Sequence, residues 1–84
     1  MRSEELAILI RTHAVELAGR FGGTVFHLDH DYMGVWRMHI GTSDRGAALL
    51  AAGATTQHDD AIPAERIALE VGPVEVYTYV RGEP

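Results

Sequence analysis

The stretch TVFHLDHDYMGVWRMHI, residues 24–40, decides the fold because apolar and polar residues alternate on both sides of a short polar turn. A period of two is typical of half-buried strands, so residues 24–29 and 35–40 are expected to form an antiparallel hairpin. The inner face is expected to carry the larger apolar side chains, namely Phe26, Leu28, Trp36, Met38 and Ile40. The outer face is expected to carry the polar ones, namely His27, Asp29, Arg37 and His39.

The residues before this hairpin predict a helix that ends at Gly22 and Gly23. At a spacing of 3.6 residues one stripe is expected to pack on the sheet, with Leu9 and Ala14 at its edges; it consists of Leu6, Ile10, His13, Leu17 and Phe21. Ile8 and Val15 fall on the opposite side, where they could form a small secondary contact such as a dimer contact.

After the hairpin, Thr42, Ser43 and Asp44 are suitable caps for a second helix through AALLAA, which Gly53 closes. The segment ATTQHDDAIP, residues 54–63, is expected to be a loop because its apolar content is low.

Residues 64–71 fit either a strand or a short helix. We favour the strand because Gly72 and Pro73 would then turn it into the alternating segment VEVYTYV, residues 74–80. In that last strand Val74, Val76, Thr78 and Val80 are expected to face inward. The outward residues are Glu75, Tyr77, Tyr79 and Arg81.

The predicted fold is therefore a single α+β domain over residues 1–84 with the element order αββαββ. A mostly antiparallel sheet with both helices packed on one face is the natural arrangement, because each apolar face needs a partner layer. The other face of the sheet would be open.

Composition narrows the possible functions. The chain of 84 residues has no cysteine, which excludes disulfides, thiolate nucleophiles and sulfur-ligated zinc sites. Twelve acidic residues against seven basic ones give a net charge of −5, which disfavours binding to a phosphate backbone. No apolar run resembles a signal peptide or membrane span, so a soluble, cytoplasmic protein without membrane contact is expected.

The stretch HLDHD, residues 27–31, concentrates residue types that bind metals and transfer protons. If Leu28 pairs with Met38, His27 lies opposite His39 and Asp29 lies opposite Arg37, whereas a register shifted by two residues would set His27 opposite Arg37. One hypothesis is a metal-dependent hydrolase-like site made by His27, His39 and Asp29. We favour a solvated sheet face followed by a polar turn, because no fixed metal-binding spacing is present; no cofactor is predicted.

Two other polar groups have simple structural interpretations. His13 is expected to be a core or boundary residue with one hydrogen-bond partner, since no nucleophile is placed to use it. His58, Asp59 and Asp60 resemble a short acidic loop, whose simplest functional role would be contact with arginines of a partner.

The outward residues Tyr77, Tyr79, Arg37, His27 and His39 are of types enriched at protein interfaces, and the glycine-aromatic signatures of sheet-type RNA-binding modules are absent. With no nucleophile elbow, phosphate loop or acid-base pair, we expect a binding module rather than an enzyme. The predicted function is that of a small acidic inhibitor or adaptor that docks on a basic surface of a larger protein, as proteins encoded by phages or mobile elements often do. A homo-oligomeric module, such as a homodimer that hides the tyrosines, is the structural alternative.

Overall fold

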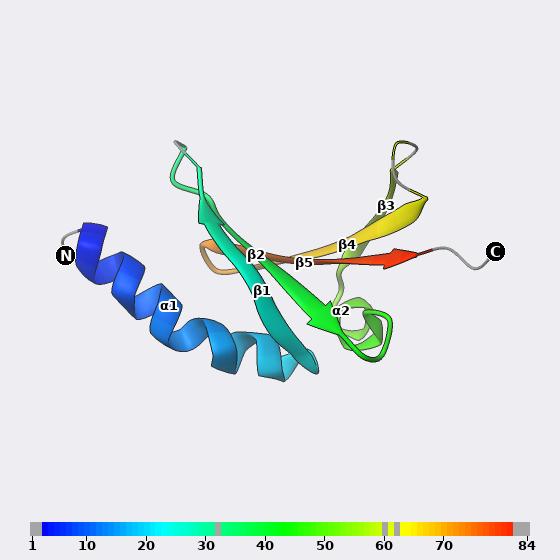
Figure 1. Cartoon of the computed structure of the whole chain (residues 1–84), viewed down its shortest axis with the longest axis horizontal. Helices are drawn as coiled ribbons and strands as arrows, with labels where there is room; N and C mark the ends of the chain where they lie inside the picture. Colours follow the sequence, from blue (N-terminus) through cyan, green and yellow to red (C-terminus); the bar gives the residue numbers. More distant parts are fainter. Residues whose placement is uncertain (1–2, 32, 60, 62, 82–84) are drawn as a thin grey trace.

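The chain forms one twisted sheet with both helices on the same side of it (Figure 1). The computed structural model describes residues 3–31, 33–59, 61 and 63–81, and only the backbone of residues 3–7, 9–11 and 59. The elements in chain order are α1 (Ser3–Arg20), β1 (Gly23–His30), β2 (Trp36–Thr42), α2 (Ala47–Ala51), β3 (Thr55–Asp59), β4 (Ala64–Val71) and β5 (Val74–Arg81). The predicted α+β class is confirmed.

The five strands lie in the order β1-β2-β5-β4-β3. The central β2 and β5 are parallel, and every other neighbouring pair is antiparallel. The hairpin has Leu28 opposite Met38 and His27 opposite His39. This is the register that the hypothesis of a site with His27 and His39 required. The parallel pair then sets His39 beside Tyr77, so residues far apart in the chain share one row across the sheet.

The prediction that Phe26 faces the core is wrong. The register of β1 slips by one residue between Val25 and His27, so Phe26 is the extra residue of a β-bulge. The bulge moves the ring of Phe26 to the opposite side of the sheet, where it is 67% exposed, while Val25 packs against the core instead.

The prediction of a loop over residues 54–63 is also wrong in part, because Thr55–Asp59 form β3, paired antiparallel with β4. Residues 55–58 are all exposed, which agrees with their low apolar content. An edge strand needs only backbone hydrogen bonds to one neighbour, so a segment without an apolar face can still join a sheet. Residues 64–71 form the strand β4, which settles the choice between strand and helix.

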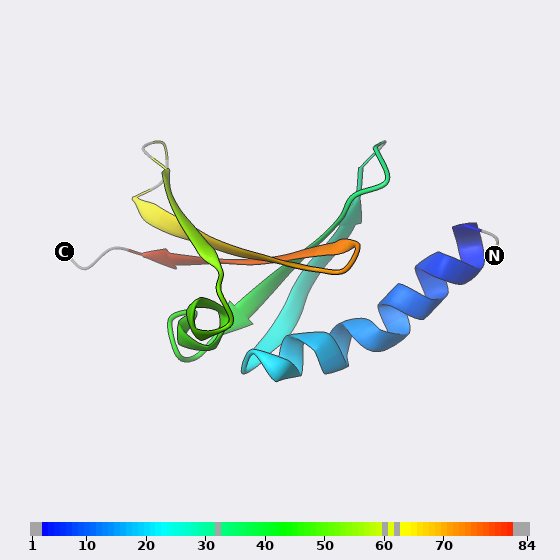
Figure 2. The same ribbon diagram turned by 180° about the vertical axis from the view of Figure 1, so that it is seen from behind.

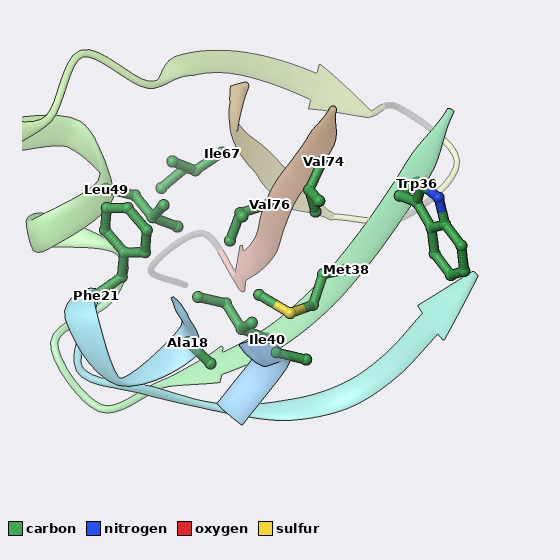
Figure 3. Packing of buried hydrophobic residues seen from close by; sticks show 10 residues of the cluster. Ala18, Phe21, Trp36, Met38, Ile40, Leu49, Ile67, Val74 and Val76 are labelled. Carbon is green, nitrogen blue, oxygen red and sulfur yellow. The ribbon is translucent and has the colours of Figure 1, made fainter. Parts of the chain in front are cut away.

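Figure 3 shows the core between the inner sheet face and the helices. Leu49 of α2 and Phe21, just after α1, meet side chains from β2, β4 and β5. The fully buried larger side chains are Met38, Ile40, Leu49 and Val76. The inward positions predicted for β5 are confirmed, because Val74, Val76 and Thr78 are buried and Val80 packs at the edge of the core.

The stripe of α1 that packs differs in part from the predicted one: Leu17 and Phe21 pack on the core as predicted, and His13 does not. Ala14 and Ala18 are buried, Leu17 is half-buried, and His13 is exposed with Nδ1 3.5 Å from Oε2 of Glu16. Two alanines let the helix approach the sheet closely, which turns the larger His13 outward. The side chains of Leu6 and Ile10 lie outside the described part.

Figure 2 shows that the first half of α1 extends beyond the sheet rather than lying under it. Ile8 and Val15 are exposed, as predicted for the side of α1 opposite its packing stripe. Within the described residues, neither helix combines the length and the apolar character needed to cross a membrane.

The loop before α2 is held by the predicted capping residues. Thr42 Oγ1 and Asp44 Oδ1 accept hydrogen bonds from the backbone N–H of Gly46, at 3.0 and 3.1 Å. Asp44 Oδ2 accepts one from Ala48 at 3.1 Å. Gly46 has a φ of 78° and lies against Ile67, so this position requires glycine and brings Leu49 over the sheet.

Candidate functional site

The face of the sheet turned away from the helices is the candidate site. Figures 1 and 2 show no helix on that side, and the sheet curves so that its outer strands rise away from the helices. Strand pairing places one row of residues across the middle of this open face, and it reads His27, His39, Tyr77, Ala68, Thr55. The predicted open face is thus present, and it brings the expected histidines and tyrosines together.

Four rings on the open face contact one another, and we call Phe26, His39, Tyr77 and Tyr79 the aromatic cluster. His39 is central: its ring stacks on Tyr77 with centroids 5.0 Å apart and meets Phe26 and Tyr79 edge-on at 5.4 and 5.5 Å. Tyr77 and Tyr79 are edge-on at 5.8 Å. Edge-on and stacked pairs are favourable because the positive ring edge meets a negative ring face.

Tyr77 is enclosed on both faces. His39 covers one face of the ring, and the guanidinium carbon of Arg66 lies 4.4 Å from the ring centroid. Arg66 lies opposite Tyr79 on the neighbouring strand, yet its guanidinium reaches past Tyr77 to donate to the carboxylate of Glu75. The tyrosine is therefore held in place by a cation-π contact and an ion pair that share one arginine.

The surroundings of His39 and Tyr77 shift the pKa values of both side chains. Burial lowers the pKa of His39, and the nearby His27 and Arg66 lower it further by charge repulsion. Burial raises the pKa of Tyr77, and the neighbouring Tyr79 acts in the same direction. Both shifts favour the neutral forms of the two rings, so the charges next to them are those of Arg66 and Glu75.

Phe26 is the member of the cluster that the sequence interpretation missed. Its ring lies across Gly41 of β2, where a Cβ atom would overlap it. Glycine inside a strand often marks a bulge or a close approach of another group. Gly41 was thus the available signal that a neighbouring side chain occupies the outer face at this point.

Charged groups flank the cluster. Asp31 accepts hydrogen bonds from the N–H groups of Met33 and Val35 at 2.9 and 3.0 Å, and from Arg37 at 2.8 Å. The bond from Val35 lowers the pKa of Asp31, and those from Arg37 and Met33 act in the same direction. Arg37 also approaches Glu75, with its Nε 3.8 Å from Oε1.

The stretch HLDHD is mostly strand. His27, Leu28, Asp29 and His30 belong to β1, and only Asp31 belongs to the turn, so the assignment of His30 to the turn is wrong. Asp29 lies opposite Arg37 as expected, but the guanidinium of Arg37 bonds to Asp31 instead. The polar turn is organised by Asp31.

The hypothetical metal ligands share the open face without forming a metal site. His27 lies opposite His39, and its Nε2 is 3.9 Å from Oδ2 of Asp29. The ring of His39 is engaged with Tyr77 and Phe26 instead of turning toward these two. Among the described residues no three histidine, aspartate or glutamate side chains come together in a way that could hold a metal ion.

The other predicted contact group is only partly described. His58 is exposed on β3, opposite Glu65 of β4, and so lies away from the aromatic cluster. Asp59 is the last residue of β3, and its side chain is outside the described part, as is Asp60. Tyr32, expected in the turn of the first hairpin, is likewise outside it.

Comparison of the chain with protein-family models, with curated proteins and with solved structures finds no match. The functional argument therefore depends on the geometry of the open face.

Proposed function

We propose that this protein is a small acidic binding module, an inhibitor or adaptor, whose aromatic cluster docks on a basic surface of a larger protein. The observation that carries the proposal is a set of four rings in mutual contact on a sheet face that no described element covers. Phe26 is 67% exposed and Tyr79 is 40% exposed, so apolar ring surface is available to a partner. Aromatic residues contribute most of the binding energy in many interfaces.

The charges around the cluster support a basic partner. Arg37 and Arg66 are already paired with Asp31 and Glu75. Glu70 lies opposite Glu75 in the register of β4 and β5. No basic side chain in the described part of the chain pairs with the carboxylate of Glu70. Together with the net charge of −5, the carboxylate of Glu70 favours a cationic partner on the same face on which the rings are exposed.

An arginine of the partner could contact both an exposed ring of the aromatic cluster and a neighbouring carboxylate. Its guanidinium can lie on an aromatic ring while its N–H groups bond to a neighbouring carboxylate, as Arg66 already does with Tyr77 and Glu75 within the chain. A nucleic-acid partner is a poorer fit, because Arg37 and Arg66, the arginines beside the aromatic cluster, are neutralised by carboxylates.

The proposal is tested by calorimetric titration with three peptides of equal length that are rich in arginine, lysine or glutamate. We expect the arginine-rich peptide to bind most tightly, with an affinity that falls as salt is added, and the acidic peptide not to bind. Tyr79→Ala should weaken the binding of the arginine-rich peptide. The matched control is Val15→Ala, which removes another exposed side chain from α1.

Two results would contradict the proposal. One is equal binding of the acidic and basic peptides, which would indicate non-specific adhesion. The other is an unchanged affinity for the arginine-rich peptide in Tyr79→Ala, because the exposed ring of the cluster would then not be part of the contact.

A further inference from the structure

The outer edge of β3 is a further surface of the molecule that could bind a partner, in addition to the open face. This strand is the last of the sheet, with β4 on one side and, among the residues that the structure describes, no strand on the other. A sheet edge presents backbone N–H and C=O groups that can pair with another strand, and proteins normally protect such edges with proline, lysine, bulges or covering elements. The sequence of β3 is TTQHD, which has no proline, lysine or glycine.

The opposite edge of the sheet differs. There β1 has a bulge at Phe26, which interrupts the regular ladder of backbone groups. In contrast, β3 pairs with β4 through five consecutive residues without a shift in register. The two edges of the same sheet are therefore unequal, and only β3 offers a regular strand to a partner.

We infer that β3 pairs antiparallel with β3 of a second copy of this chain, around a two-fold axis at Gln57. Residues that face one another in an antiparallel pair lie on the same side of the sheet, so a symmetric pair must be centred on a residue. Centring on Gln57 is the register that pairs all of Thr55–Asp59. It sets Gln57 opposite its own copy, Thr55 opposite Asp59, and Thr56 opposite His58.

The charges of β3 are compatible with this pairing. Asp59 is the only formally charged residue of the strand at neutral pH with histidine neutral. In the proposed register the two copies of Asp59 lie at opposite ends of the paired segment, four residues apart, or roughly 13 Å along the strand. This separation exceeds the Debye length of about 8 Å at physiological salt, so their repulsion is largely screened.

A two-fold axis perpendicular to the sheet keeps both helix layers on one side. The two open faces then form one continuous surface that displays two aromatic clusters. Such a dimer would bind a partner with repeated basic segments at two points, which raises the overall affinity without any new type of contact.

The inference is tested by sedimentation equilibrium of the full chain over a dilution series, with charge variants at position 57. The unmodified chain should be a concentration-dependent dimer. Gln57→Lys and Gln57→Glu should each be monomeric, because each sets two like charges against one another on the axis. Mixing the two variants should restore a dimer, since opposite charges then meet.

Cross-linking gives a second measurement, which is clean because the chain has no cysteine. Gln57→Cys should form a disulfide dimer under mild oxidation, because Cα atoms of directly opposed residues lie about 4.5–5.5 Å apart. Thr24→Cys, at an exposed position on β1, should not. An unmodified chain that stays monomeric at every concentration, or a dimer that Gln57→Lys leaves intact, overturns the inference.

Discussion

The rings of His39 and Tyr77 lie parallel, with centroids 5.0 Å apart and an angle of 5° between their planes. They come from β2 and β5, the one parallel pair of neighbouring strands among the described pairs. Arg66 from β4 closes the other face of the Tyr77 ring. Three strands are thus tied together on the open face by one stacked group, which is a stabilising contact and the binding surface that we propose.

Replacement of Tyr77 by alanine should lower the free energy of unfolding by at least about 1–2 kcal/mol, from the loss of its aromatic contacts with His39 and Tyr79 and of its cation-π contact with Arg66. Tyr77→Phe is the matched control and should stay close to the unmodified chain, because the ring makes both contacts. Urea denaturation followed by circular dichroism measures the difference. If phenylalanine were as damaging as alanine, the hydroxyl and not the stack would be responsible.

Acidification should destabilise the protein through His39. Burial lowers the pKa of His39 in the folded state, whereas the unfolded chain takes up a proton at about 6.5. The unfolded state therefore binds more protons in the window below 6.5, and stability falls as the pH drops through it.

A variant without this titrating group isolates the effect. His39→Gln should show a flatter dependence of the unfolding free energy on pH below 6.5. His13→Gln, which removes a histidine of α1 that lies outside the aromatic cluster, is the comparison variant. Parallel curves for the His39 variant and the unmodified protein would show that His39 does not carry the dependence.

Gly46→Ala should be more harmful than Gly34→Ala. Both glycines have left-handed backbone, with φ of 78° and 85°, so alanine costs about 1–2 kcal/mol of backbone strain at either position. A Cβ atom at position 46 would also lie 2.8 Å from Cδ1 of the buried Ile67, whereas the space at position 34 is open. Thermal unfolding should rank the two variants accordingly, and equal melting temperatures would contradict the close packing at Gly46.

Leu49→Ala should cost about 2–5 kcal/mol, because Leu49 is fully buried between α2 and the sheet. Leu50→Ala changes the next residue of the same helix, which is 46% exposed, and should cost under about 1 kcal/mol. Urea denaturation of both variants checks the orientation of α2. If Leu50→Ala were more destabilising than Leu49→Ala, α2 would have to pack on the sheet through the side that carries Leu50.

The alternating pattern of the sequence was sufficient to predict the first hairpin, β5 and the open face with its tyrosines, whereas it left residues 64–71 open between strand and helix. Periodicity is a local signal, and it identifies which residues of a regular strand share a face. It failed at Phe26, because a single extra residue in a bulge reverses the alternation without changing the composition.

Other features depended on contacts between distant segments. β3 has no apolar face, and it is a strand only because β4 offers a backbone ladder. His13 was placed in the core by spacing alone, but Ala14 and Ala18 determine which side of α1 approaches the sheet. The reach of Arg66 past Tyr77 to Glu75 could not be predicted either, because it follows from the order of strands in the sheet.

The central claim is that the aromatic cluster is the contact surface for a basic partner. The most direct test is nuclear magnetic resonance of the isotope-labelled full chain during titration with the arginine-rich peptide. We expect the largest chemical-shift changes on His39, Tyr77 and Tyr79 and their strand neighbours, and we expect these changes to diminish as salt is added. Shifts concentrated on the helix side, at Val15 or Leu50, would contradict this claim.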